Sequence, residues 1–153
     1  MAYRVAIVDD SKTDAEYVQS ILNTWAQDRQ AGVQAQRFTS AENFLFHYAD
    51  DKDWDILLLD IEMGAMDGVS LAKRIRQENE LVQIVFITGF PDFMSEGYEV
   101  SALHYLMKPV AKEKLFTVLD KAAANLGKND KQLATHPLRG SIFENMVLNE
   151  VLK

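Results

Sequence analysis

Five side chains at four separate points of the sequence could act together in one chemical step. They are three carboxylates, one hydroxyl and one ammonium group: Asp9, Asp10, Asp60, Thr88 and Lys108. Clustered carboxylates repel one another, and a cation among them relieves that repulsion. Hard oxygen ligands suit Mg²⁺, which keeps several waters and accepts one or two carboxylates together with a phosphoryl oxygen. If these groups meet, they predict a magnesium site that handles phosphoryl groups.

The same five groups also predict what such a site could do. A carboxylate beside Mg²⁺ can attack phosphorus and form an aspartyl phosphate. The hydroxyl of Thr88 and the ammonium of Lys108 would then contact the oxygens of the transferred group and stabilise their charge. Each residue alone has an ordinary alternative, because acidic pairs form solvated turns and Lys108-Pro109 can simply end a strand. Only their ordered combination favours the functional interpretation.

Short apolar runs precede these residues and predict the elements that position them. The runs are Tyr3–Val8, Ile56–Leu59, Ile84–Ile87 and Leu103–Met107. Continuous aliphatic runs of this length are typical of strands covered on both faces. A weaker run, 33–38, alternates apolar and polar residues and predicts a strand nearer an edge. Because parallel strands point the same way, polar residues at their carboxyl ends should converge on one rim of the sheet.

Segments with helical spacing separate the strands. Helices are expected after Ser11, after Thr39-Ser40, after Asp67-Gly68, over roughly Asp92 to Glu99, and over Leu115 to Leu126 with Gly127 just past the end. Five strands alternating with five helices predict an α/β fold, a three-layer, doubly wound, five-stranded parallel sheet.

The order of the chemical groups resembles that of the receiver domain of two-component response regulators. The resemblance covers about residues 2–126, predicts a receiver domain over 1–126 and implies the flavodoxin-like fold of CheY. It implies that Asp60 is the phosphoacceptor. It also implies that Asp10, helped by Asp9, holds Mg²⁺ together with Asp60 and the backbone carbonyl of Glu62.

The resemblance further assigns the groups that follow the last two strands. Thr88 and Lys108 would bind the phosphoryl group, and Tyr105 would turn inward when Thr88 moves, as a switch. The Lys108-Pro109 bond is cis in the family. The family usually has proline four residues after the phosphoacceptor, where this chain has Gly64, and glycine predicts a looser loop there.

The function implied is a phosphorylation-dependent receiver that takes phosphate from a sensor histidine kinase and catalyses its own phosphotransfer, without being an enzyme in the ordinary sense. The segment Ala102–Pro109 is similar to receivers joined to LytTR-type DNA-binding domains, although too few residues follow Leu126 for such a domain. Two alternatives stay open. One is a Mg²⁺-dependent phosphohydrolase of the haloacid dehalogenase type, with Glu62 in place of its second aspartate. The other is an unphosphorylated receiver-like interaction module.

The last part of the chain departs from the alternating pattern. Residues 127–140 are polar and predict a linker, and residues 141–153 predict an amphipathic helix. That helix could dock on its own domain, pair with a partner or second copy, or be the stub of a further domain. A homodimer could form through this helix, or through a face of the fourth helix and fifth strand. The apolar residues of that face are Phe93, Met94, Tyr98, Val100 and Tyr105.

Composition narrows the classes of function further. The 153 residues are 48% hydrophobic and 25% charged, as in a folded globular protein. A net charge of −7 disfavours direct binding to nucleic acid. There is no cysteine and no apolar run long enough to cross a bilayer, so we expect a cytoplasmic protein that does not bind membranes.

Overall fold

A computed structural model describes the backbone of residues 2–89 and 100–134, with side chains to residue 127. The helix expected over 92–99 and the amphipathic helix expected over 141–153 lie outside the described residues. The chain divides into two compact units, residues 1–119 and 120–153. In the second unit, the described backbone of residues 120–134 is helical.

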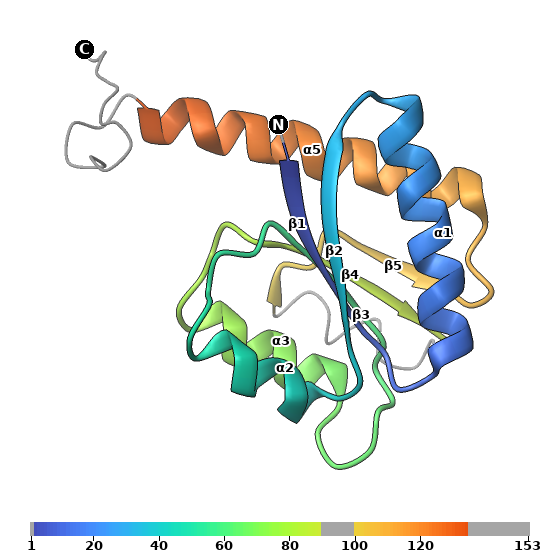
Figure 1. Ribbon diagram of the computed structural model, residues 1–153. Helices are drawn as coiled ribbons and strands as arrows, with labels where there is room; N and C mark the ends of the chain where they lie inside the picture. Colours follow the sequence, from blue (N-terminus) through green and yellow to red (C-terminus); the bar gives the residue numbers. More distant parts are fainter. Residues whose placement is uncertain (1, 90–99, 135–153) are drawn as a thin grey trace. The chain divides into compact units, whose positions relative to one another are not determined.

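Five parallel strands form a single sheet in the order β2-β1-β3-β4-β5 (Figure 1). Their bounds are β1 Ala2–Val8, β2 Gly32–Phe38, β3 Ile56–Leu59, β4 Gln83–Thr88 and β5 His104–Met107. The edge position expected for 33–38 is confirmed, because β2 pairs only with β1 in this sheet. Val8 pairs with both Phe38 and Leu59, so three strands end side by side.

The described helices are α1 Lys12–Asp28, α2 Ala41–Tyr48, α3 Gly68–Arg76 and α5 Lys112–Ala134. Helices α1, α2 and α3 each begin after a side chain that accepts a hydrogen bond from the backbone N–H three residues on: Ser11, Ser40 and Asp67. These bonds satisfy donors that the first turn of a helix leaves without partners. Three helix starts therefore follow directly from the local sequence.

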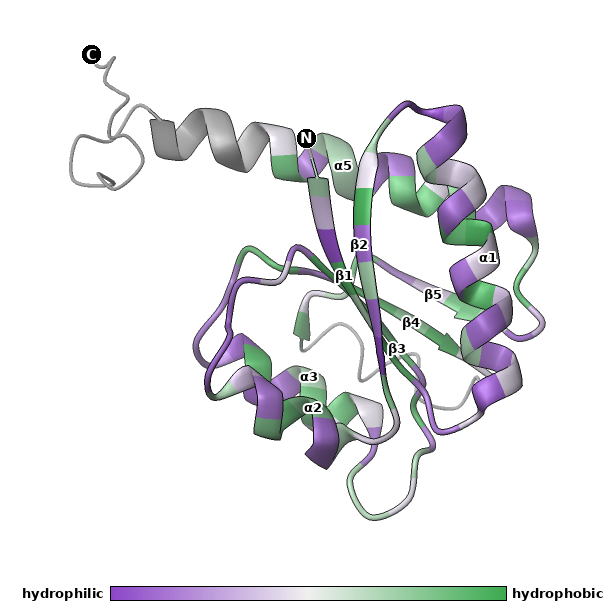
Figure 2. Cartoon of the chain, viewed as in Figure 1, coloured by the Kyte–Doolittle hydropathy of each residue, from purple (hydrophilic) through white to green (hydrophobic). Residues whose placement is uncertain are grey.

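The helices cover both faces of the sheet, which confirms the three-layer α/β architecture. Every residue of β3 and β4 is buried. Alternate strand side chains, including Val8, Leu59 and Phe86, pack in one cluster with α2 and α3. The buried side chains between them point to the opposite face, because strand side chains alternate. Figure 1 shows α1 and the first turns of α5 on that face. The hydropathy pattern agrees, since β3 is hydrophobic throughout, β1 and β4 are hydrophobic over most of their length, and the helices carry hydrophilic residues (Figure 2).

The end expected for the last helix is wrong. Helix α5 continues past Gly127 to Ala134, so residues 127–134 are helical, and the role of residues 127–140 as a linker stays a prediction. A glycine that closes a helix takes a left-handed backbone conformation, and Gly127 does not. The following residues include Lys128, Gln132 and Ala134, which favour the helix.

Arg76, at the end of α3, ties down the segment that leads into β5. Its guanidinium donates to the carbonyl oxygens of Val100 at 2.6 Å and Ser101 at 3.2 Å. It also donates to Asn79 at 3.1 Å and Val82 at 2.7 Å. Val100 is buried in the core and does not lie on an exposed apolar face as expected. Among the described helices, none is both long and apolar enough to cross a membrane.

Candidate functional site

The carboxyl ends of β1 and β3 bring the acidic residues together. Asp9 and Asp10 follow β1, and Asp60 follows β3. The Asp60 N–H donates to the Val8 carbonyl at 2.9 Å, and the Asp9 N–H donates to the Phe38 carbonyl at 3.1 Å. The hydrogen bonding of the sheet thus extends one residue beyond the strands, and it holds the backbone of Asp9 and Asp60 in place.

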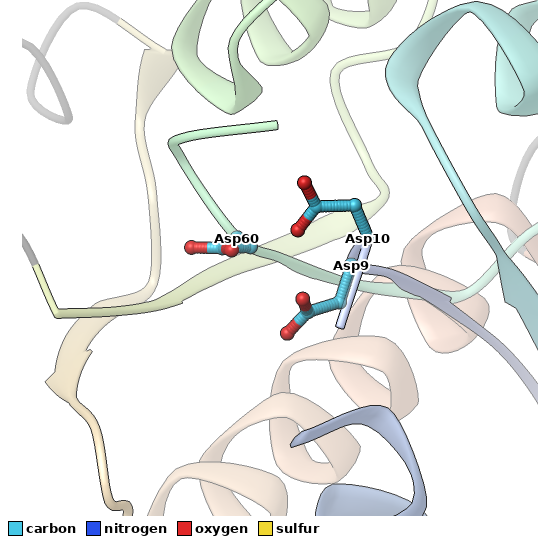
Figure 3. Close-up of side chains that lie close together, drawn as sticks. All are labelled: Asp9, Asp10 and Asp60. Carbon is cyan, nitrogen blue, oxygen red and sulfur yellow. The ribbon is translucent and has the colours of Figure 1, made fainter. Parts of the chain in front are cut away.

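The three carboxylates form a compact cluster (Figure 3). Asp9, Asp10 and Asp60 each offer one oxygen, and these oxygens all lie within 4.8 Å of one another. Asp9 and Asp60 are only 4% and 7% exposed, whereas Asp10 is exposed to solvent. The convergence expected from the strand ends is therefore present for all three acids.

Lys108 reaches the same cluster from the end of the edge strand β5. It directly follows β5, and its N–H donates to the carbonyl of Thr88 at 2.9 Å. Its Nζ lies 2.9 Å from Oδ2 of Asp9 and 3.2 Å from Oδ2 of Asp60. Thr88 ends β4 and is fully buried. The Lys108-Pro109 bond is cis, as the resemblance implied.

Burial and charge act in opposite directions on these groups. Burial raises the pKa of Asp9 above its ordinary value, although the hydrogen bonds from Ser11 and Lys108 act to lower it. Burial would lower the pKa of Lys108, but hydrogen bonds to Asp14 and Asp9 and the charge of Asp60 more than offset it, so the pKa rises. The ammonium group therefore stays charged among the acids.

The two oxygens of Asp60 have different surroundings. Oδ1 accepts from the N–H of Ile61 at 2.8 Å, while Oδ2 faces Lys108. Behind the backbone of Asp60 lies Gly68, whose own N–H donates to the carbonyl of Ile61 at 2.8 Å. A Cβ atom on Gly68 would lie 2.0 Å from the carbonyl oxygen of Asp60. The first residue of α3 therefore has to be glycine for Asp60 to keep this position.

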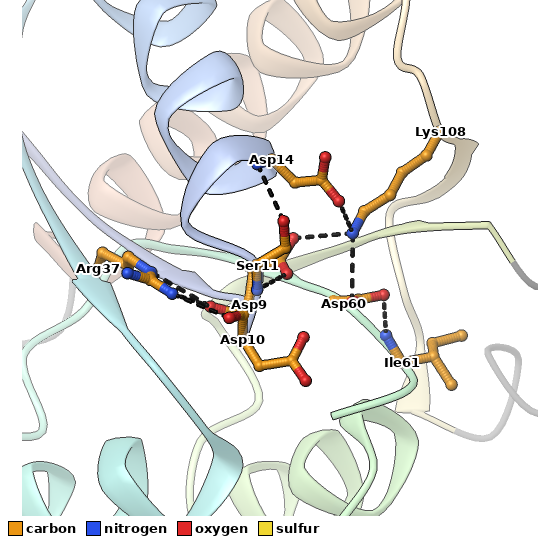
Figure 4. A network of polar contacts seen from close by, with 8 residues as sticks. All are labelled: Asp9, Asp10, Ser11, Asp14, Arg37, Asp60, Ile61 and Lys108. Carbon is orange, nitrogen blue, oxygen red and sulfur yellow. Dashed lines mark hydrogen bonds and ion pairs between the residues drawn. The ribbon is translucent and has the colours of Figure 1, made fainter. Parts of the chain in front are cut away.

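Asp14 is a site residue that the sequence pattern did not reveal. Its Oδ2 lies 2.8 Å from Nζ of Lys108 (Figure 4). The hydroxyl of Ser11 accepts from the N–H of Asp14 at 3.2 Å, and the N–H of Ser11 donates to Oδ1 of Asp9 at 2.9 Å. The available signal was an acid in the first turn of a helix that begins at the rim of the sheet.

Arg37 is a second residue that the pattern did not reveal. From β2, its guanidinium donates to the carbonyl of Asp9 at 3.1 and 3.2 Å and to that of Asp10 at 3.2 Å. Figure 4 shows Arg37 and Lys108 on opposite sides of the acidic pair. Arg37 is the next-to-last residue of the edge strand β2, which pairs with β1, and β1 ends at Asp9 and Asp10. That position is the feature from which sequence analysis could have predicted its place at the site.

We expect Arg37→Met to lower the free energy of unfolding by about 1 kcal/mol, because two backbone carbonyls lose a charged donor at a partly exposed place. Urea unfolding followed by circular dichroism measures the change. Gln36→Met is the matched control, since Gln36 is exposed on the same strand. Equal stability losses in the two variants would contradict a specific contribution of the Arg37 bonds.

Three further expectations concern two loop residues, Gly64 and Glu62, and Tyr105 of β5. Gly64 has a φ of +98°, a conformation that proline cannot adopt, so the loop has a defined left-handed turn where the sequence suggested looseness. Tyr105 is half-buried, and its ring centroid lies 5.6 Å from that of Phe86. The side chain of Glu62 is exposed. The roles assigned to the Glu62 carbonyl and to Tyr105 stay predictions.

The donor set fits Mg²⁺. The acids offer hard carboxylate oxygens at one place, and the exposed Asp10 leaves the cluster open to water, which Mg²⁺ retains in its coordination shell. Thiolate ligands are absent because the chain has no cysteine. The cluster is therefore chemically compatible with Mg²⁺.

Residues 5–120 match the family model of the response regulator receiver domain, a span that contains every residue of this cluster. The chain belongs to that family. Receiver domains of two-component systems are signalling domains that work with histidine kinases, and they typically bind Mg²⁺ at an acidic cluster such as this one. This receiver has that cluster in Asp9, Asp10 and Asp60.

Two relatives from Bacillus subtilis are longer than this chain and match it over part of their length. The chain is 30% identical over 118 residues to the sensory transduction protein LytT, covering 77% of this chain and 47% of LytT. It is 28% identical over 118 residues to the transcriptional regulatory protein NatR, covering 77% of this chain and 48% of NatR. The chain thus spans just under half the length of these relatives.

Solved receiver structures share the fold. The response regulatory domain of protein mrkE from Klebsiella pneumoniae superposes with a TM-score of 0.73 at 26% identity, covering 82% of this chain and 98% of that one. The N-terminal domain of a response regulator from Carboxydothermus hydrogenoformans gives 0.71 at 29% identity, with the same coverage of 82% and 98%. The CheY-like assignment is confirmed.

Proposed function

We propose that this receiver accepts a phosphoryl group on Asp60 from a phosphohistidine of a sensor histidine kinase, and that the domain itself catalyses the transfer. One observation carries the proposal. The ammonium of Lys108 lies 3.2 Å from Oδ2 of Asp60 and 2.9 Å from Oδ2 of Asp9, within a cluster of three carboxylates. A nucleophile, a charge-stabilising cation and oxygen ligands for a metal thus occur together.

The groups have separate parts in the proposed transfer. A carboxylate oxygen of Asp60 bonds to phosphorus as the phosphorus–nitrogen bond of the donor breaks, and the imidazole leaves neutral because it keeps its other ring proton. Lys108 and Thr88 bind the phosphoryl oxygens, where charge is spread in the transition state. Asp9, Asp10, Asp60 and the Glu62 carbonyl would hold Mg²⁺, which neutralises phosphoryl charge when bound.

The signal would leave the site through Thr88 and Tyr105. Movement of Thr88 toward the phosphoryl group opens space for the half-buried ring of Tyr105 to turn inward, which shifts a two-state equilibrium at the adjoining surface. That surface, or the amphipathic helix predicted for residues 141–153, would pair with a partner or a second copy. We assign the receiver domain to residues 1–126. We also propose that this chain does not bind nucleic acid directly, because its net charge of −7 repels phosphate backbones.

The decisive experiment uses acetyl phosphate with Mg²⁺ and intact-mass measurement. We expect the wild type to gain one phosphoryl group and Asp60→Asn to gain none, because the amide is a poor nucleophile. Asp28→Asn, an exposed acid at the far end of α1, is the matched control and should be labelled like the wild type. An unlabelled wild type would favour an unphosphorylated interaction module, and steady release of phosphate from small phosphoesters would favour a phosphohydrolase.

A further inference from the structure

Lys108 has three carboxylate partners, and one of them lies outside the acidic cluster of Asp9, Asp10 and Asp60. Its Nζ lies 2.8 Å from Asp14, 2.9 Å from Asp9 and 3.2 Å from Asp60. Asp14 is thus at least as close to the ammonium as the proposed phosphoacceptor is (Figure 4). An ammonium group has three N–H donors, so these three acids can occupy all of them.

The local structure holds Asp14 in place for this contact. Its N–H donates to the capping hydroxyl of Ser11, so the first turn of α1 fixes the backbone from which the carboxylate extends. Lys108 approaches from the end of β5, 94 residues along the chain. The ion pair between Asp14 and Lys108 therefore joins the start of α1 to the end of β5 beside the acidic cluster.

The three acids differ in how easily they can release the ammonium. The side chains of Asp9 and Asp60 are 6% and 7% exposed, whereas that of Asp14 is 45% exposed. Water can therefore solvate the Asp14 carboxylate when Lys108 turns away from it. A buried acid that loses its cation has no such compensation.

We propose that Asp14 is a positioning residue that competes with the phosphoryl group for Lys108. The inference rests on the proposed function, because it concerns a phosphoryl group bound at Asp60. When that group arrives, one N–H of Lys108 has to turn to a phosphoryl oxygen, and Asp14 is the acceptor it leaves. Asp14 thereby weakens binding of the phosphoryl group and sets how far the receiver is modified at a given supply of donor.

Removal of the competing carboxylate should strengthen the site for a phosphoryl mimic. We expect Asp14→Asn to bind beryllofluoride about three- to tenfold more tightly than the wild type at saturating Mg²⁺, a gain of the size that a partly exposed ion pair can supply. Titration followed by isothermal calorimetry measures the affinity. Asp14→Glu keeps the charge within reach of Lys108 and should return the affinity toward that of the wild type.

Two controls separate the ion pair from a general effect of charge. Glu16→Gln removes an exposed acid from the same helix and should leave the affinity within about twofold of the wild type. The gain in Asp14→Asn should persist at about 0.5 M salt, where the screening length falls to a few ångströms and distant charges cease to matter.

The possible results distinguish this inference from the function on which it rests. Equal or weaker beryllofluoride binding by Asp14→Asn, beside a wild type that binds, would overturn the competition and leave the proposed function standing. An equal gain in Glu16→Gln would also overturn it. A wild type that neither binds beryllofluoride nor accepts phosphate from acetyl phosphate would overturn both.

Discussion

Gly68→Ala is expected to lose roughly 3 kcal/mol of stability, although alanine is the better helix former by about 1 kcal/mol. The added Cβ would lie 2.0 Å from the carbonyl oxygen of Asp60 and 2.9 Å from its carbonyl carbon. Both atoms are backbone, so no flexible side chain can move aside. Either α3 has to shift or the backbone of Asp60 has to leave the position that the sheet gives it.

The same substitution should also impair the site. We expect labelling by acetyl phosphate to slow by about tenfold or more, because small displacements of a nucleophile have large effects on rate. Chemical denaturation and intact-mass kinetics measure the two effects. Gly127→Ala is the control, because that glycine is helical and a Cβ there meets no atom within 4 Å. A Gly68→Ala variant as stable as the Gly127→Ala variant would contradict the close approach at Asp60.

Arg76→Met is expected to cost about 2–4 kcal/mol in the free energy of unfolding, because one charged donor group serves four backbone carbonyls. Burial lowers the pKa of Arg76, which reflects the cost of placing the guanidinium there. Without this side chain, all four carbonyls lose the guanidinium as a hydrogen-bond donor. The segment at Val100–Ser101, which leads into β5, would be released first.

Urea unfolding measures the loss, and hydrogen exchange at the amides of β5 locates it. Arg76→Lys should recover less than half of the stability, because a single ammonium cannot reproduce the planar, multiple donation of a guanidinium. Arg74→Met, on an exposed position of the same helix, is the control and should change stability by at most about 0.5 kcal/mol. Arg74→Met and Arg76→Met with equal stability would contradict the anchoring of this segment.

The parts of the fold that sequence could predict are those with a local cause. The aliphatic run Ile56–Leu59 predicted a fully buried strand, and Ser11 and Ser40 predicted where helices begin. The end of α5 could not be predicted in the same way. Gly127 stops a helix only if it takes a left-handed conformation, and a single glycine within favourable residues does not have to do so.

The candidate site shows the same division. Asp9, Asp60 and Lys108 could be placed together because each directly follows a parallel strand. The approach of Asp14 depends on the angle at which α1 leaves the sheet, which the spacing of residues does not encode. Val100 was expected on the surface, but its side chain packs in the core cluster with residues of the strands, α2 and α3, a tertiary contact that local residue spacing does not encode.

The backbone conformation of Gly64 limits which residues can replace it in this loop. The family usually has proline at this position, and the ring of proline fixes φ near −65°, whereas Gly64 has a φ of +98°. A consensus substitution here would therefore demand a different path for the peptide between Asp60 and α3. The torsion angles of the whole loop would have to change together, because proline cannot adopt the φ of Gly64.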